Sequence, residues 1–294
     1  MSRFIRSVLL SSAFISMIFF TLAKHAFSQT ITEAIKEDNV QNSLSFDEAF
    51  QEYLSRIDEY DVAHQDYVLK RAQYLRFKTL KSREEAHSAT LVMLQKRDDV
   101  IIYYIKALEK RLDEAIGVTN GRRESLNFRT NAEIDWLENH KEVLTSAGSL
   151  DDLIEDSDEA KERFSSLQPL VYEVLATISL GRIIDFQERV NDLYNQIKTK
   201  VEDIKKEERD EYKLSESKLQ TIDRWLFESG NRIIRGEEKQ DNAAVKIENL
   251  SAISATAFSE YYNSLSLMGE TQLFYKEASS FMKEVIREIK IKDQ

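Results

Sequence analysis

The sequence predicts an all-α fold, an elongated antiparallel helical bundle or coiled coil of two to three long helices plus one short helix. The 294 residues include only 7 Gly and 1 Pro, whereas globular proteins average about 7% and 5%, so the chain has too few turn formers for a sheet-rich fold. The hydrophobic content of 42% is too high for a disordered chain. Apolar residues also recur at spacings of three and four over long segments, which is typical of helices that pack on other helices.

Residues 1–28 have the pattern of an export signal. Two arginines precede an apolar run of 16 residues over 8–23, which is shorter than the roughly 20 residues of a membrane-spanning helix. Small side chains, Ala26 and Ser28, occupy the −3 and −1 positions of a cleavage site. The sequence therefore predicts an exported protein that is periplasmic or extracellular, or anchored in a membrane and facing outward if the signal is not cleaved.

A flexible lead-in is expected over 29–44, a single elongated helical coiled-coil domain over 45–290, and a polar tail over 291–294. The absence of Gly and Pro from 46 to 116 predicts one helix of about 70 residues. Ser45 and Glu48 form a capping-box pattern at its start, which fixes the expected N-terminus of this helix. Its apolar seam, which becomes polar at Arg71 and Lys78, runs through Phe46, Phe50, Tyr53, Ile57, Tyr60, His64 and Tyr67.

Breaks near 117 and 148 divide the rest of the helical pattern. Thr130, with Glu133 three residues later, is expected to begin the short helix, and the last long segment continues to about residue 290. Pro169 is expected in the first turn of a helix or at a kink. The glycines at 230–236 leave open whether the chain breaks there or passes straight through. The two tight breaks favour antiparallel packing of neighbouring helices.

A basic and aromatic segment over 70–83 supplies three candidate interaction residues, Tyr74, Arg76 and Phe77. Such a composition can bind nucleic acid or a lipid surface. The chain as a whole has a net charge of −11, and three of its 41 basic residues but none of its acids lie in the first 28 residues. This acidic balance favours a solvated helix face that pairs with acidic neighbours. No nucleic-acid partner is expected, and membrane contact is expected only through 1–28 if that segment is uncleaved.

A second candidate surface lies in the segment 251–266, which is dense in Ala, Ser and Thr. Small side chains allow two helices to approach closely, so the segment is expected to pack tightly inside the bundle or to form a self-association face. Tyr261 and Tyr262 would be the anchors of that face, because tyrosine is favoured at interfaces.

The sequence offers no site for catalysis, cofactor or metal. The acidic run over 151–159 lacks the Gly of a calcium loop and is expected to be an acidic first helical turn. His64, His87 and His140 have no zinc-site spacing, the chain has no Cys, and no nucleophile elbow or phosphate-binding loop occurs. His64, on the apolar seam, is expected to be a partly buried polar residue. A non-enzymatic protein without cofactor is therefore expected.

These observations predict an exported coiled-coil scaffold or adaptor that acts by helix–helix contact with itself or with another envelope protein. An alternative is an extracytoplasmic helical bundle that binds a small molecule in a pocket between helices. Its lining would draw on an aromatic set, Tyr103, Tyr104, Trp136 or Trp225. A further alternative is a coiled-coil regulator of a cell-wall enzyme.

Overall fold

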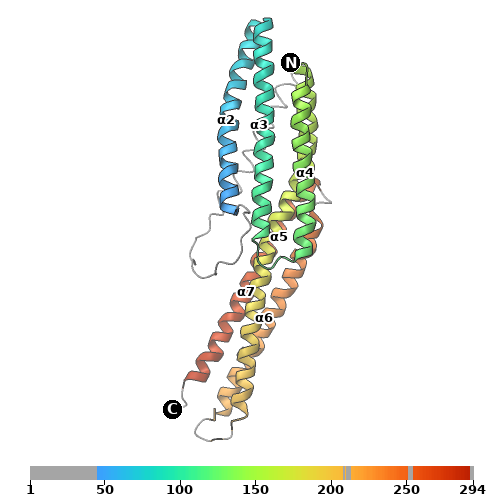
Figure 1. Ribbon diagram of the computed structural model, residues 1–294. Coiled ribbons are helices and arrows are strands. Elements are labelled where there is room, and N and C mark those ends of the chain that lie inside the picture. Colours follow the sequence, from blue (N-terminus) through green and yellow to red (C-terminus); the bar gives the residue numbers. More distant parts are fainter. Residues whose placement is uncertain (1–44, 208, 210–212, 251–253, 292–294) are drawn as a thin grey trace. The chain divides into compact units, whose positions relative to one another are not determined.

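The computed structural model describes residues 45–207, 209, 213–250 and 254–291, and within these residues it forms α-helices and one short 3₁₀ turn (Figure 1). The predicted all-α class is confirmed. The predicted signal over 1–28 with Ala26 and Ser28, the lead-in over 29–44 and the tail beyond 291 lie outside the described residues. The elements are α2 (Phe46–Phe77), α3 (Leu80–Asp113), α4 (Asn120–Ser146), α5 (Leu150–Lys205), α6 (Glu216–Glu248), η2 (Ser254–Thr256) and α7 (Ala257–Lys290).

The expected number of long helices is wrong, because the segment 46–116, which was expected to form one helix, forms two, α2 and α3. The chain turns back at Lys78, whose backbone is left-handed (φ 51°, ψ 32°) and whose N–H donates to the Tyr74 carbonyl (2.9 Å). Thr79 then caps α3, since its Oγ1 accepts from the Ser82 N–H (3.1 Å) while its own N–H donates to Ser82 Oγ (3.0 Å). This fold-back covers the apolar seam of α2 with α3, which an isolated rod could not do.

The structure confirms one of the other predicted helix boundaries and corrects two. The capping box at Ser45 is confirmed, because Ser45 and Glu48 bond reciprocally. The expected short helix begins at Asn120 instead of Thr130 and is 27 residues long. Pro169 lies inside the 56-residue α5, so its placement in a first turn is wrong. Gly230 and Gly236 both lie within α6, so the chain passes straight through that region.

The chain forms two compact units, one holding residues up to 110 with 129–165, the other 111–128 with 166–294. In the first unit, α2 and α3 run antiparallel, because Glu59 pairs with Lys96 (2.6 Å) and, further along α2, Lys70 pairs with the earlier Glu85 (2.9 Å). Figure 1 shows α4 beside this hairpin. Side chains from all four helices of the unit fill its core, among them Tyr53, Tyr60, Leu94, Ile105, Leu137, Leu153 and Phe164.

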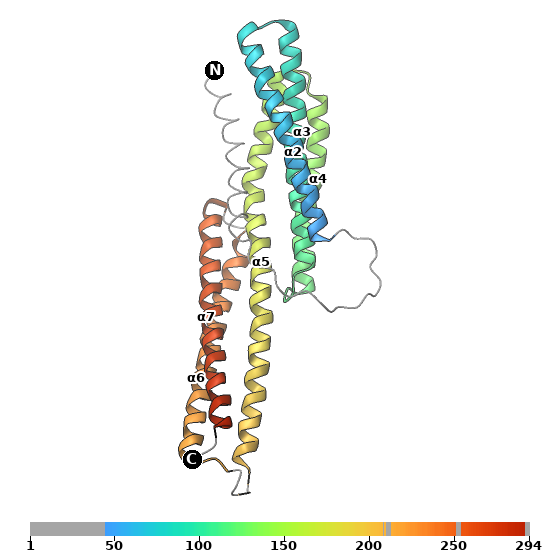
Figure 2. The same ribbon diagram turned by 90° about the vertical axis from the view of Figure 1, so that its left-hand side faces the viewer.

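In the second unit, α6 and α7 pack along each other and against the later part of α5 (Figure 2). Tyr275 of α7 is fully buried, donates to Gln240 Oε1 of α6 (3.1 Å) and packs edge-on against Phe186 of α5. Gln240 in turn donates to Gln187 of α5 (2.7 Å). The core around Tyr275 therefore joins all three helices through apolar contact and a chain of side-chain hydrogen bonds.

Two glycines allow the loop after α3 to lie directly on α5 in this unit. Gly117 has a positive φ of 70°, and a Cβ placed there would lie 2.0 Å from the carbonyl oxygen of Gly181. Arg123 fixes the same loop, because its guanidinium donates to the carbonyls of Leu112 (3.2 Å) and Ala115 (3.0 Å). The Leu112 carbonyl also accepts from the Ala115 N–H (3.1 Å), so Arg123 adds donors at a helix end where the last carbonyls have no intrahelical partners.

We predict that Gly236→Ala destabilises the protein and that Gly269→Ala stabilises it. A Cβ at Gly236 would lie 2.3 Å from Cε1 of the buried Tyr275, whereas a Cβ at Gly269 has nothing within 4 Å. Overpacking costs about 1–3 kcal/mol, and Ala gains about 1 kcal/mol over Gly in a helix. Urea unfolding of the two variants should move the midpoint in opposite directions, and equal shifts would contradict the packing described for Tyr275.

Candidate functional site

The predicted interaction residues Tyr74, Arg76 and Phe77 lie together at the end of α2. Tyr74 is half-buried, and the Arg76 guanidinium lies 5.2 Å from the centre of the Phe77 ring. Leu75, Phe77 and Leu80 are exposed by 51%, 59% and 73%. We call this end of the α2–α3 hairpin the hairpin tip, and it consists of Leu75, Arg76, Phe77, Lys78, Leu80 and Lys81.

The hairpin tip is exposed because the hairpin is longer than the helices beside it. His87 Nε2 of α3 lies 3.1 Å from the Ala147 carbonyl oxygen, so the α4–α5 connection ends at the level of His87. Leu80, the first residue of α3, is seven positions before His87, which corresponds to about 10 Å of helix. Figures 1 and 2 both show the hairpin extending past that connection. Beyond His87, therefore, α2 and α3 pack only on each other among the described elements, and the outer sides of the hairpin are exposed.

The cations of the segment 70–83 divide into paired and unpaired ones. Lys70 forms an ion pair with Glu85, and this hydrogen bond raises the pKa of Lys70. For Lys70, the expected pairing of this segment with an acidic neighbour is confirmed. Arg76, Lys78 and Arg83 are exposed and form no ion pair within the described part of the chain.

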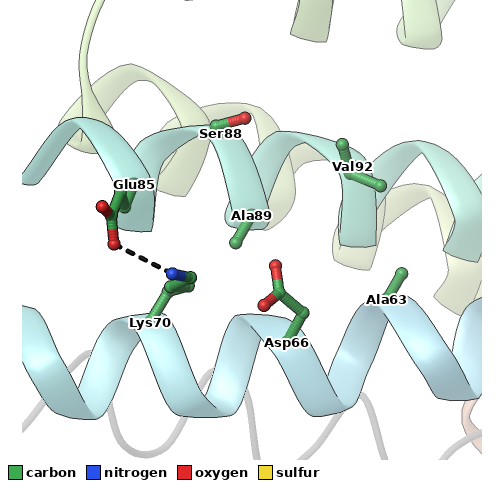
Figure 3. A pocket seen from close by; sticks show the side chains of 7 residues that line it. All are labelled: Ala63, Asp66, Lys70, Glu85, Ser88, Ala89 and Val92. Atoms are coloured by element: carbon green, nitrogen blue, oxygen red, sulfur yellow. Dashed lines mark hydrogen bonds and ion pairs between the residues drawn. The ribbon is translucent and has the colours of Figure 1, made fainter. Parts of the chain in front are cut away.

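A groove of about 220 Å³ lies between α2 and α3 next to the Lys70–Glu85 pair (Figure 3). Figure 3 shows Asp66 and Lys70 facing the groove from α2 and the small side chain of Ala89 facing it from α3. Its complete lining is Ala63, Asp66, Lys70, Glu85, Ser88, Ala89 and Val92. Ligand pockets usually measure about 300–1,000 Å³, so this groove is better matched to one inserted side chain than to a cofactor.

The second predicted surface is divided between core and solvent. Tyr261 is half-buried and stacks on Tyr172 of α5 at a ring distance of 4.9 Å, and burial raises the pKa of Tyr261 to about 12. Tyr262 is exposed and meets the exposed Phe258 edge to face. Tyr261 thus packs inside the unit, and Tyr262 faces solvent.

The aromatic residues expected to line a ligand pocket have other partners. Tyr104 packs on Tyr53, and the Tyr103 ring lies 4.6 Å below the Arg56 guanidinium. Trp225 belongs to the second unit and stacks on Phe281. Among the described residues, no group of three or more His, Cys, Asp and Glu side chains could hold a metal ion. The acidic run over 151–159 lies at the start of α5, as expected.

A buried polar cluster at His140 was not predicted. His140 Nδ1 lies 2.6 Å from Asp98 Oδ2, and Nε2 lies 3.1 Å from the Asp156 carbonyl oxygen, so both ring nitrogens face acceptors. Arg97 donates from Nε and Nη2 to Asp98 (3.3 Å each) and from Nη1 to Ser157 (3.1 Å). Trp136 stacks on the imidazole at 5.0 Å. The cluster joins α3, α4 and α5 of the first unit.

A signal for this cluster exists in the sequence. Leu94, Asp98, Ile101 and Ile105 step by four, three and four, so Asp98 occupies a core position on the seam of α3. A carboxylate at such a position requires a partner, because an unpaired buried charge is costly. His64, also on a seam, is half-buried between Tyr60 and Tyr67, in agreement with the prediction made for it.

The two acceptors favour the doubly protonated imidazolium of His140. Burial by itself lowers the pKa of His140, but the hydrogen bond and charge of Asp98 and the Asp156 carbonyl outweigh burial and the repulsion from Arg97, and raise it above 6.5. Asp156 itself has a raised pKa because of its burial. Stability from His140 protonation is therefore fully present below about pH 6.5 and is lost as the pH rises through the raised pKa.

We predict that His140→Gln destabilises the protein most at about pH 6 and less at about pH 9, because only the protonated ring gains from Asp98. Asp98→Asn removes the charge at similar size and should flatten the pH dependence in the same way. Urea unfolding of both variants and of the unchanged protein at the two pH values measures the difference. A loss of stability that is equal at the two pH values would contradict the raised pKa.

The chain matches no protein-family model, no curated protein and no solved structure.

Proposed function

We propose that the protein is an exported, non-enzymatic helical adaptor that binds another protein through exposed faces of its helices. The elongated antiparallel bundle expected from the sequence is part of this proposal. The observation that carries it is an apolar row on the outer face of α2. Val62 and Leu69 are exposed by 70% and 54%, although the opposite face of α2 buries Tyr60 and Tyr67. We call Val62 and Leu69 the outer row.

The outer row has the pattern of a helix-binding face. Val62 and Leu69 are seven residues apart, which places them on one side of the helix. A helix with apolar residues on both sides is normally covered on both. Val92 of α3 is also exposed and lies across the groove of Figure 3, so a partner helix could rest on α2 and insert one side chain into the groove.

A second apolar row supports the adaptor function. Phe227, Ile234 and Val245 of α6 are exposed, and their spacings of 7 and 11 residues place them on one face of the helix. This row belongs to the second unit, whereas the outer row belongs to the first. Each unit therefore offers its own surface for a helix, as an adaptor requires.

Charge indicates the kind of partner that fits the outer row. The exposed acids Asp58, Asp61 and Asp66 flank this row on α2. A second copy would bring the same acids together on a chain that is already acidic, with a net charge of −11. We therefore assign the outer row to a different protein that presents an amphipathic helix with Lys or Arg beside its apolar stripe.

Localisation follows from the same proposal. The exported location rests on the signal pattern of residues 1–28. One described helix, α5, contains a window that is long and apolar enough to cross a membrane, but 61% of that window is buried, as in the core helix of a soluble protein. This weak indication does not alter the proposed location.

We predict that crosslinking in cells, followed by mass spectrometry, captures a partner protein at α2 and that Val62→Glu with Leu69→Glu reduces this capture at least tenfold. Burial of each apolar side chain contributes about 1.5–3 kcal/mol, so the loss of two is sufficient for such a change. The matched control is Val143→Glu on α4, an exposed valine outside both rows. Equal capture by all three proteins would contradict the proposal, and crosslinks only between copies would assign the row to self-association.

A further inference from the structure

We propose that the hairpin tip docks on an anionic lipid bilayer, with its apolar side chains in the headgroup–acyl boundary and its cations at the level of the phosphates. This inference concerns a different surface and a different partner from those of the adaptor function, and it does not depend on that function. It also adds a membrane contact that the sequence did not predict.

The first argument is charge. Residues 70–83 contain six Lys and Arg and no acid, within a chain whose net charge is −11. Lys70 is neutralised by Glu85, but Arg76, Lys78 and Arg83 have no acidic partner among the described residues. An anionic surface attracts a cationic patch even on an acidic protein, and each cation near the surface raises the affinity for anionic lipid by roughly fivefold.

The start of α3 departs from the pattern of the other helices. Helices α2, α5, α6 and α7 each have an acid in the first turn, where it complements the helix dipole, but α3 and α4 have none. In α4 the exception has an internal explanation, because Arg122 pairs with the buried Glu173 and Arg123 binds backbone carbonyls. In α3, Lys81 has only a distant contact with Glu85 at 4.0 Å. Its charge therefore remains available for an external anion.

The turn between α2 and α3 has a lysine, Lys78, in a backbone conformation that is unfavourable for a residue with a side chain. Lys78 is the one non-glycine residue in the described part of the chain with a positive φ, a conformation that glycine adopts without strain. A lysine at this position is unfavourable for the fold and places a positive charge at the end of the hairpin. Such a departure from local preference is expected where a residue serves function instead of stability.

Shape and apolar exposure favour a bilayer over other anionic partners. The hairpin tip extends about 10 Å past the α4–α5 connection, so Leu75, Phe77 and Leu80 project from a convex end. A nucleic acid or an acidic peptide would satisfy the cations but would leave most of these apolar side chains in water. A bilayer accepts both, because long basic side chains extend to the phosphates while Leu and Phe enter the boundary below.

The test uses the absence of cysteine from the chain. Leu80→Cys in the full chain is labelled with the environment-sensitive dye NBD and mixed with vesicles of phosphatidylglycerol and phosphatidylcholine in equal parts, or of phosphatidylcholine alone. We expect a blue shift and a several-fold rise in fluorescence with the anionic vesicles only, which salt suppresses. The matched control is NBD at Val143→Cys, because a membrane contact made by residues 1–28 alone would not move the dye at Leu80 relative to this control.

Charge reversal tests the cations. Arg76→Glu, Lys78→Glu and Lys81→Glu together, in the labelled protein, should weaken binding to anionic vesicles by roughly a hundredfold or more. The control with the same change in net charge is Lys161→Glu, Lys198→Glu and Lys200→Glu, all at exposed positions elsewhere, and it should bind nearly as well as the parent protein. Both proteins should retain partner capture through the outer row, which separates this test from that of the proposed function.

Lys78→Gly separates folding from binding. Glycine relieves the positive φ, so the variant should melt at a higher temperature than the parent, while the loss of one cation should weaken vesicle binding by about fivefold. A variant that is merely misfolded would show a lower melting temperature.

Three results would overturn the proposal. The first is a dye response at Leu80 that is equal for the two vesicle types, and the second is an equal response at Val143. The third is binding of the labelled protein to a single-stranded oligonucleotide, or to a second copy, that is lost on charge reversal while vesicles cause no blue shift. That last result would assign the cations of the hairpin tip to nucleic acid or to protein instead of lipid.

Discussion

A long amphipathic helix cannot cover its own apolar stripe, and this constraint governs both units of the protein. With 7 Gly and 1 Pro the chain has few places to turn, so it forms helices of 27 to 56 residues that pack on one another. Neighbouring helices run antiparallel because the connections between them are short. Where a third helix ends before the other two, as beside the α2–α3 hairpin, apolar side chains remain exposed. The outer row on α2 and the hairpin tip are both local consequences of this constraint, the first on an uncovered side and the second at an uncovered end.

The sequence predicted the helical class, the capping box at Ser45 and the acidic start of α5, because these depend on composition and on signals within a few residues. It did not predict the turn at Lys78, since that turn contains neither Gly nor Pro and its cap is the uncommon pair Thr79 and Ser82. The polar interruption of the seam at Lys78 was the available sign. Tyr74, Arg76 and Phe77 were selected from composition, but the exposure of Arg76 and Phe77 depends on where α4 ends, which is a property of the tertiary structure. The lining of the groove and the partners of Tyr261 likewise depend on which helices meet.

The cluster of Arg97, Asp98 and His140 shows how a helical bundle can specify one arrangement. Apolar seams with a period of three and four tolerate a shift of one helix along another. A buried carboxylate does not, because it must meet its histidine and arginine at one level of the bundle. Removal of one partner from such a buried ion pair typically costs about 3–5 kcal/mol. The cluster thus selects among alignments of α3, α4 and α5 that apolar packing alone would leave close in energy.

The same cluster has a consequence for the order in which the first unit is made during synthesis. When α2 and α3 have emerged, Asp98 and Arg97 still need water, because His140 and Ser157 lie on segments that come later in the chain. The hairpin can form early from contacts that are close in sequence. Its interior cannot exclude water until α4 and the start of α5 have been synthesised and pack on it. The first unit can therefore complete its fold only after residue 157 has been synthesised. Until then its core stays accessible to water, and the growing chain can still be unfolded and transported.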